Sequence, residues 1–123
     1  MKESSVIGKR AEQMVAETLR KNGAIISKMN YRSRYGEIDI VAETHKYLIF
    51  VEVKLRKKNS LVSPRQAVDP HKQRRIILTA KDYILKSQSS EALKVRFDVA
   101  EVVYDIDLSD NITYKINYIK NAF

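Results

Sequence analysis

The 123-residue sequence predicts a single α/β domain over residues 1–123, in which helices cover a mixed β-sheet. Apolar residues recur at helical spacing in two segments. Short apolar runs, some of them alternating with polar residues, lie between and after these segments and are typical of strands. A hydrophobic fraction of 44% supplies enough apolar side chains for one core.

Both predicted helices have recognisable ends. The first spans residues 6–22, and Gly23 follows it where a helix C-cap is expected. The second begins at Asp69-Pro70, an N-cap followed by proline at the first helical position, and continues to about Ser87. Ser63-Pro64 resembles the same pattern and opens a short turn before it. The apolar faces hold Ile7, Ala11, Met14, Val15 and Leu19 in the first helix, and Ile76, Ile77, Ala80 and Ile84 in the second.

The strand pattern begins with an antiparallel hairpin whose turn is residues 43–46. Regular alternation in its first strand places Ile38, Ile40 and Ala42 on one face and Asp39 on the other. Strands are expected over residues 37–42, 47–55, 94–104 and 111–119.

Charge and composition narrow the partner class. Lys and Arg outnumber Asp and Glu by 23 to 15, and the net charge of +8 favours an anionic partner, with nucleic acid first and a membrane surface second. No apolar run approaches the ~20 residues that span a bilayer, and the N-terminus lacks a signal-like apolar core, so we expect a cytoplasmic protein. Because cysteine is absent, a metal site here needs oxygen or imidazole ligands.

Two acids lie within the otherwise apolar hairpin strands. Asp39 and Glu52 need a cation, a metal or a hydrogen-bond network, because an ionised carboxylate is costly to remove from water. Lys54 shares the strand face of Glu52, while Val51 and Val53 lie on the other face. Two carboxylates and a lysine together are suited to hold Mg²⁺ against a phosphate, which predicts phosphodiester hydrolysis.

The order of these residues resembles a known nuclease signature. Asp39 followed by Glu52-Val53-Lys54 resembles the Asp…Glu-x-Lys motif of the PD-(D/E)XK nuclease superfamily, and Glu12 resembles the upstream acid of its Holliday-junction resolvase branch. Over nearly the whole chain the sequence resembles the YraN-type family, bacterial proteins described as candidate endonucleases. The matching stretches are 8–16, 36–39, 50–54, Ser63-Pro64, 67–70 with Lys72, 96–99 and 121–123.

The resemblance implies a restriction-endonuclease-like fold with an αβββαβ core, which uses Mg²⁺ or Mn²⁺ to hydrolyse DNA. Two positions depart from the family pattern, with Ala11 where glycine is usual and Leu55 where threonine is usual. The implied roles are Asp39 and Glu52 as metal ligands, Glu12 as an accessory acid on the metal side, Lys54 as the catalytic lysine, and Gln66 and Lys72 as substrate-side helpers.

Several of these residues also have an ordinary structural interpretation. On helix geometry Glu12 is a rim carboxylate paired with a nearby Lys or Arg, and the resemblance gives the two interpretations equal weight. A lone Glu-Val-Lys is typical of any solvated strand face. Glu37 shares the predicted face of Asp39 but lies at an exposed edge, so it stays outside the ligand set. Arg96 and Asp98 favour a structural ion pair, with a phosphate contact as the alternative for Arg96.

Basic residues follow the predicted active strand and continue into the second helix. Their contacts with phosphates would position a DNA backbone without reading its sequence. Tyr31, Arg32, Arg34 and Tyr35 form a predicted loop before Gly36, in which packing of the tyrosines is favoured over base stacking. The predicted DNA-binding residues are Arg56, Lys57, Lys58, Arg65, Lys72, Arg74 and Arg75.

The sequence therefore predicts a Mg²⁺-dependent endodeoxyribonuclease. Branched DNA is a substrate by analogy only, and symmetric cutting of two strands would require a two-fold dimer. The alternative is a non-catalytic nucleic-acid-binding module with the same fold. A third interpretation, an RNA-associated basic protein, has little motif support.

Overall fold

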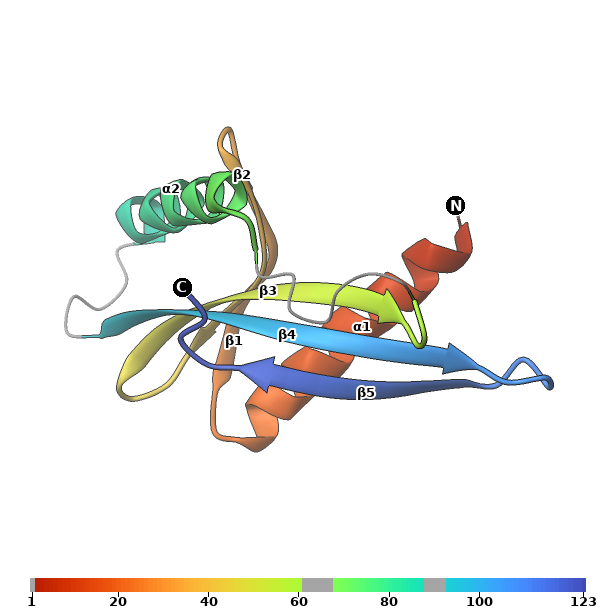
Figure 1. Ribbon diagram of the computed structural model, residues 1–123. Helices are drawn as coiled ribbons and strands as arrows, with labels where there is room; N and C mark the ends of the chain where they lie inside the picture. Colours follow the sequence, from red (N-terminus) through yellow and green to blue (C-terminus); the bar gives the residue numbers. More distant parts are fainter. Residues whose placement is uncertain (1, 61–67, 88–92) are drawn as a thin grey trace.

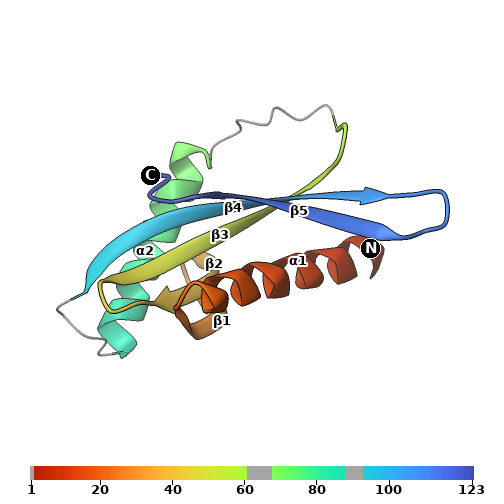
Figure 2. The same cartoon turned by 90° about the horizontal axis from the view of Figure 1, so that it is seen from below.

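A computed structural model describes residues 2–60, 68–87 and 93–123, which form a five-stranded mixed sheet with one helix against each face (Figure 1, Figure 2). The elements are α1 (Lys2–Lys21), β1 (Ile25–Ser33), β2 (Gly36–Glu43), β3 (Tyr47–Lys57), α2 (Pro70–Ser87), β4 (Lys94–Ile106) and β5 (Ile112–Ile119). The strands follow chain order across the sheet, and only the β3–β4 pair is parallel. This α/β arrangement confirms the predicted restriction-endonuclease-like fold class.

Each helix covers its own apolar core. Helix α1 packs on one face and α2 on the other, as the turned view in Figure 2 shows. Burial of each large aliphatic or aromatic side chain contributes about 1.5–3 kcal/mol. The α1-side core contains Ala11, Val15, Ala16, Leu19, Ala24, Ile40, Ala42, Ile49, Val51, Ala100 and Val102. The α2-side core contains Ile38, Val41, Leu48, Phe50, Val68, Ile76, Ala80 and Val99.

The helix ends follow the signals in the sequence. Gly23 adopts a φ of +91°, and its amide donates to the carbonyl of Arg20 at 3.0 Å, so the predicted C-cap is confirmed. The Asp69 side chain accepts a hydrogen bond from the amide of Lys72 at 2.9 Å, which is N-cap geometry before Pro70. That hydrogen bond is the main cause of a lowered pKa for the Asp69 carboxyl. The predicted Ser63-Pro64 turn lies outside the described residues.

The predicted loop before Gly36 is partly wrong. Tyr31 and Arg32 belong to β1, which pairs with β2 in antiparallel fashion. This strand is at the edge of the sheet and alternates exposed and half-buried residues irregularly, so no clean period marked it in the sequence. The preference for packing was correct for Tyr31, whose ring meets that of Tyr83 edge to face at 5.1 Å.

The regular alternation predicted for β2 is also wrong. Ile40 and Ala42 belong to the α1-side core as a pair, but Ile38 belongs to the α2-side core. Two residues that are two positions apart therefore lie on opposite faces, and the reversal falls at Asp39. This change of face, which the sequence period does not show, decides the surroundings of the Asp39 carboxyl.

No helix in the described ranges is long and apolar enough to cross a bilayer.

Candidate active site

Asp39 and Glu52 lie where β2 and β3 stop pairing. The paired residues run from Glu43 with Leu48 to Ile40 with Val51, so the two acids are the first residues beyond that ladder. The amide of Val53 then has no strand partner on the β2 side and instead donates to Asp39 Oδ2 at 2.7 Å. The carboxylate of Asp39 thus takes the place of a strand hydrogen bond at the point of separation.

The surroundings of Asp39 raise the pKa of its carboxyl to about 8. The largest cause is burial, followed by a hydrogen bond with the Glu52 carboxyl and the negative charges of Glu52 and Glu12. The Val53 amide acts in the opposite direction and does not offset them. Asp39 therefore holds a proton near neutral pH, as expected of an acid that is buried beside a second acid.

The ion-pair partner of Glu52 comes from helix α2. Its side chain is only 9% exposed, and its Oε2 lies 3.2 Å from Nζ of Lys72 in the first turn of α2. The ammonium of Lys72 is 40% exposed, so the pair reaches from the protein interior to solvent. Lys72 is therefore held at the acidic pair rather than on an open basic surface.

Lys54 lies on the same strand face as Glu52, as predicted. Val53 and Leu55 pack against the α1-side core, and alternation along β3 turns Lys54 toward the α2 face. Lys54 is half-buried and is in register with Glu101 of β4. Asp39 and Glu52 thus lie at one level of two adjacent strands, and Lys54 lies two residues further along β3 on the face of Glu52.

Glu12 reaches the site from α1. Its charge contributes to the raised pKa of Asp39, which places it within electrostatic range of that carboxyl. Its Oε1 accepts a hydrogen bond of 3.0 Å from the side-chain amide of Asn30 in β1. Sequence reasoning missed Asn30, because an isolated polar residue in an irregular edge strand carries no periodic signal.

The acidic pair suits a hard divalent cation. Within the described ranges, no three His, Asp or Glu side chains gather closely enough to form a complete metal cage. Mg²⁺ does not need one, since it keeps several waters and takes one or two carboxylates together with phosphate oxygens. The raised pKa of Asp39 beside Glu52 marks a place where a cation would replace a proton, so these residues fit the group.

The predicted DNA-binding residues fall into two groups. Lys57, Lys58 and Arg56 lie at the end of β3, whereas Arg74 and Arg75 are exposed on α2 near Lys72. Arg56 is an ion-pair partner of Glu101 at 3.1 Å, and Lys58 lies 4.0 Å from Asp105. Arg65 and Gln66 lie outside the described residues.

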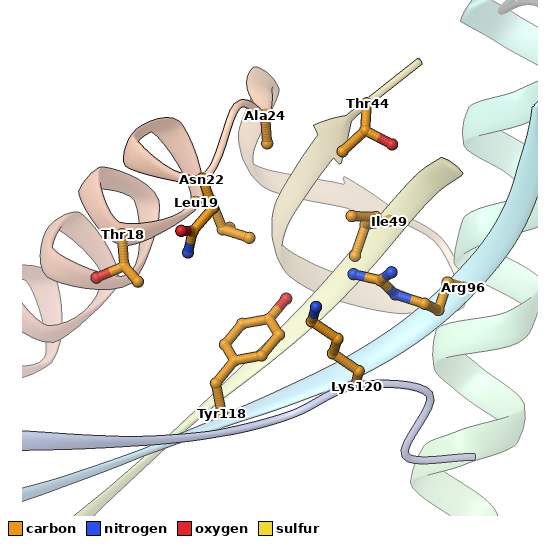
Figure 3. Close-up of a pocket in the computed structure, with 9 residues that line it drawn as sticks. All are labelled: Thr18, Leu19, Asn22, Ala24, Thr44, Ile49, Arg96, Tyr118 and Lys120. Atoms are coloured by element: carbon orange, nitrogen blue, oxygen red, sulfur yellow. The ribbon is translucent and has the colours of Figure 1, made fainter. Parts of the chain in front are cut away.

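A second carboxylate, that of Asp98 in β4, is fully buried. Arg96 donates from Nε to Asp98 Oδ1 at 2.9 Å and stacks over the ring of Tyr47, so the predicted structural ion pair is confirmed. Tyr118 donates its hydroxyl to Asp98 at 2.6 Å. Figure 3 shows Arg96, Tyr118 and Lys120 pointing toward a cavity of about 520 Å³ beside the end of α1.

The fold and the paired acids define a class of α/β protein with a restriction-endonuclease-like fold and a candidate metal-dependent site. The chain belongs to the uncharacterised protein family UPF0102, also called the YraN family, whose model matches residues 11–102. It is 38% identical over 117 residues to a UPF0102 protein of Clostridium botulinum (strain 657 / Type Ba4), covering 95% of this chain and 93% of that protein. A UPF0102 protein of Caldicellulosiruptor bescii is 40% identical over 117 residues, covering 95% and 96%. The predicted family resemblance is confirmed.

Proposed function

We propose that this protein is a Mg²⁺-dependent endonuclease that hydrolyses DNA phosphodiester bonds. The observation that supports it most directly is the hydrogen-bonded carboxyl pair of Asp39 and Glu52 at the point where β2 and β3 separate. Lys54 on the same strand face as Glu52 adds the cation that phosphate chemistry needs. The net charge of +8 agrees with a nucleic-acid substrate, and we propose a cytoplasmic location.

Each residue of the site has a defined task in this proposal. Asp39 and Glu52 would hold the metal, with the Val53 amide fixing the Asp39 carboxylate. When bound, Mg²⁺ supplies a Lewis acid that polarises the phosphoryl group and lowers the pKa of a coordinated water. Lys54 stabilises the negative charge that develops on the phosphoryl oxygens. Lys72 balances the buried charge of Glu52 and holds the first turn of α2 beside the acidic pair.

The partner in this proposal is DNA, and the substrate proposed first is branched DNA. Arg74 and Arg75 extend the positive surface from Lys72 along α2 and would contact phosphates. Cutting a four-way junction symmetrically requires two active sites related by a two-fold axis, so this substrate comes with a homodimer. Sedimentation of the protein with a junction tests the dimer, and a strict monomer on that DNA would remove the branched-DNA part.

The test is cleavage of supercoiled, single-stranded and four-way-junction DNA in Mg²⁺ or Mn²⁺. We compare the native chain with Asp39→Asn and Lys54→Met, and use Glu43→Gln and Lys94→Met as matched controls at the far ends of β2 and β4. The expected result is metal-dependent cutting that falls by roughly 100-fold or more in the first two variants. The two controls should cut at the native rate, and the loss in the first two variants then excludes a contaminating nuclease.

Two outcomes would reject the nuclease. Equal cutting by the native chain and Asp39→Asn would show that the activity does not come from this site. Tight, salt-dependent DNA binding without any cutting, and without a response to Mg²⁺, would favour the non-catalytic binding module instead. Preference for an RNA duplex in a competition assay would favour an RNA-associated protein.

A further inference from the structure

Asn30 has an unusual backbone for a residue inside a strand. Its φ is +51°, in the left-handed region that non-glycine residues rarely adopt. The other described non-glycine residues with positive φ, which are Asn59, Asp110 and Asn121, lie outside helices and strands. A left-handed residue within a strand marks a local distortion that the surrounding structure maintains.

This distortion lies directly beside the acidic pair. The neighbouring pairs of the β1–β2 ladder are Met29 with Ile40 and Tyr31 with Ile38, which places Asn30 opposite Asp39. Met29 packs on the α1-side core and Tyr31 on the α2-side core, so β1 changes faces at Asn30. β2 changes faces at the same level. The side chains of both strands therefore exchange the α1 face for the α2 face there, and Asp39 lies at this exchange.

The side chain of Asn30 points to another acid of the site. Its Nδ2 donates to Glu12 Oε1 at 3.0 Å, across the space between β1 and α1. Asn30 and Glu12 both line a groove of about 460 Å³, together with Gln13 and Met29. Asn30 therefore lies opposite Asp39 in the sheet and is hydrogen-bonded to Glu12.

The energies of the Asn30 hydrogen bond and of its backbone conformation favour a role in positioning over a role in stability. The hydrogen bond to Glu12 is exposed, and such a bond adds only about 0.5–1.5 kcal/mol to stability. Asparagine adopts the left-handed region at lower cost than most residues, because its short polar side chain bonds locally. Glycine would meet the backbone requirement more cheaply still, so the amide is the feature that glycine would not supply.

We propose that Asn30 is a positioning residue of the active site, which reverses the β1–β2 ribbon at Asp39 and holds the Glu12 carboxylate toward the metal side of that acid. The inference rests on the proposed function. It assigns a role to a residue that contacts neither the metal ligands Asp39 and Glu52 by side chain nor the reacting phosphate. In metal sites, residues that do not bind the metal themselves orient the acids around it through hydrogen bonds.

The experiment separates the backbone from the amide. Asn30→Gly keeps the left-handed conformation and removes the amide, whereas Asn30→Ala disfavours the conformation as well. Asn121→Gly is the matched control, because Asn121 has a φ of +54° in a turn away from the acidic pair. For each variant we measure unfolding in urea, the Mn²⁺ dissociation constant by calorimetry, and kcat and KM for DNA cleavage.

The urea midpoint of unfolding of Asn30→Gly should equal or exceed that of the native chain. The variant should nevertheless bind Mn²⁺ roughly 10-fold more weakly or worse. Its kcat should fall while KM for DNA stays unchanged, and Asn121→Gly should match the native chain. Asn30→Ala should show the same loss with lower stability. In a Glu12→Gln background, Asn30→Gly should have no further effect on Mn²⁺ affinity, since it acts through that carboxylate.

Native Mn²⁺ affinity and native kcat in Asn30→Gly would overturn the inference while leaving the nuclease intact. A raised KM with unchanged kcat would also overturn it, by showing that the amide contacts DNA. An effect of equal size in the Glu12→Gln background would exclude action through Glu12. A native chain that neither binds Mn²⁺ nor cuts DNA would instead reject the proposed function, and this inference with it.

Discussion

Asp39 and Asp98 are both carboxylates embedded in the strands of one sheet, but their surroundings are opposite. Asp98 is fully buried and accepts hydrogen bonds from Arg96, Tyr118 and the Asn121 amide. Among the described residues, Asp39 accepts one from the Val53 amide and lies beside the Glu52 carboxyl. The first carboxylate is satisfied by several donors, whereas the second lies where a cation would be favourable.

The contrast teaches how a structural acid differs from a candidate metal ligand. A buried charge that contributes to folding is surrounded by donors, since an unpaired one costs several kcal/mol. In the metal-free protein, the buried pair of Asp39 and Glu52 lowers the stability of the folded state. This is expected of a site that binds a cation. Substitutions at the two aspartates should therefore change stability in opposite directions.

The largest effect is expected from Asp98→Asn. Removing the charge leaves Arg96 without its buried partner at only 15% exposure and weakens the bond from Tyr118. The expected loss is about 3–5 kcal/mol in the free energy of unfolding, measured by urea denaturation. A loss below about 1 kcal/mol would show that the cluster is not the structural counterpart of the acidic pair.

Asp39→Asn should stabilise the metal-free protein, and more so as pH rises. The folded pKa of about 8 lies above the ordinary value of 3.8, so the folded state binds the extra proton and native stability falls as pH increases between these values. The advantage of Asp39→Asn over the native chain should grow from pH 5 to pH 8 by about 3–4 kcal/mol. Urea unfolding in EDTA measures it, and an advantage independent of pH would contradict the raised pKa.

Lys72→Met should destabilise the metal-free protein modestly. The variant leaves Glu52 without its ammonium partner while keeping the aliphatic stem of the side chain. Because Lys72 is partly exposed, we expect a loss of about 1–2 kcal/mol, between the values for surface and buried pairs. Lys81→Met on the exposed side of the same helix is the control, and equal losses in both variants would mean that the Glu52 contact contributes nothing.

The smallest effect is expected from Tyr118→Phe. Asp98 keeps its bonds from Arg96 and from the Asn121 amide, so the variant removes one donor among several. Burial followed by the hydrogen bond to Asp98 raises the pKa of Tyr118, which keeps its hydroxyl protonated as a donor. We expect a loss of about 1 kcal/mol, and no loss would show that this hydrogen bond is dispensable.

Much of the fold followed from local signals in the sequence. The N-cap at Asp69, the glycine at position 23 and the turn at residues 43–46 each depend on neighbours a few positions away, so their patterns predicted the correct ends. The irregular edge strand β1 was not predicted, because its pairing with β2 and its change of faces at Asn30 depend on tertiary contacts.

The candidate site was predictable to the same extent. Alternation along β3 and the hairpin with β2 placed Asp39, Glu52 and Lys54 together. The link from Lys72 to Glu52 spans two layers of the fold, and local spacing carries no information about it. Asn30 was missed for the same reason, because only the folded chain brings its amide to Glu12.

The most direct measurement of the central claim is calorimetric titration of Mn²⁺ into the metal-free native chain, Asp39→Asn and the control Asp105→Asn at pH 7.5. We predict binding by the native chain with release of a proton, because the cation replaces the proton held by Asp39. Asp39→Asn should bind at least about 10-fold more weakly, and Asp105→Asn should bind like the native chain. Equal affinity in Asp39→Asn, or no binding by the native chain, would contradict a metal site at this pair.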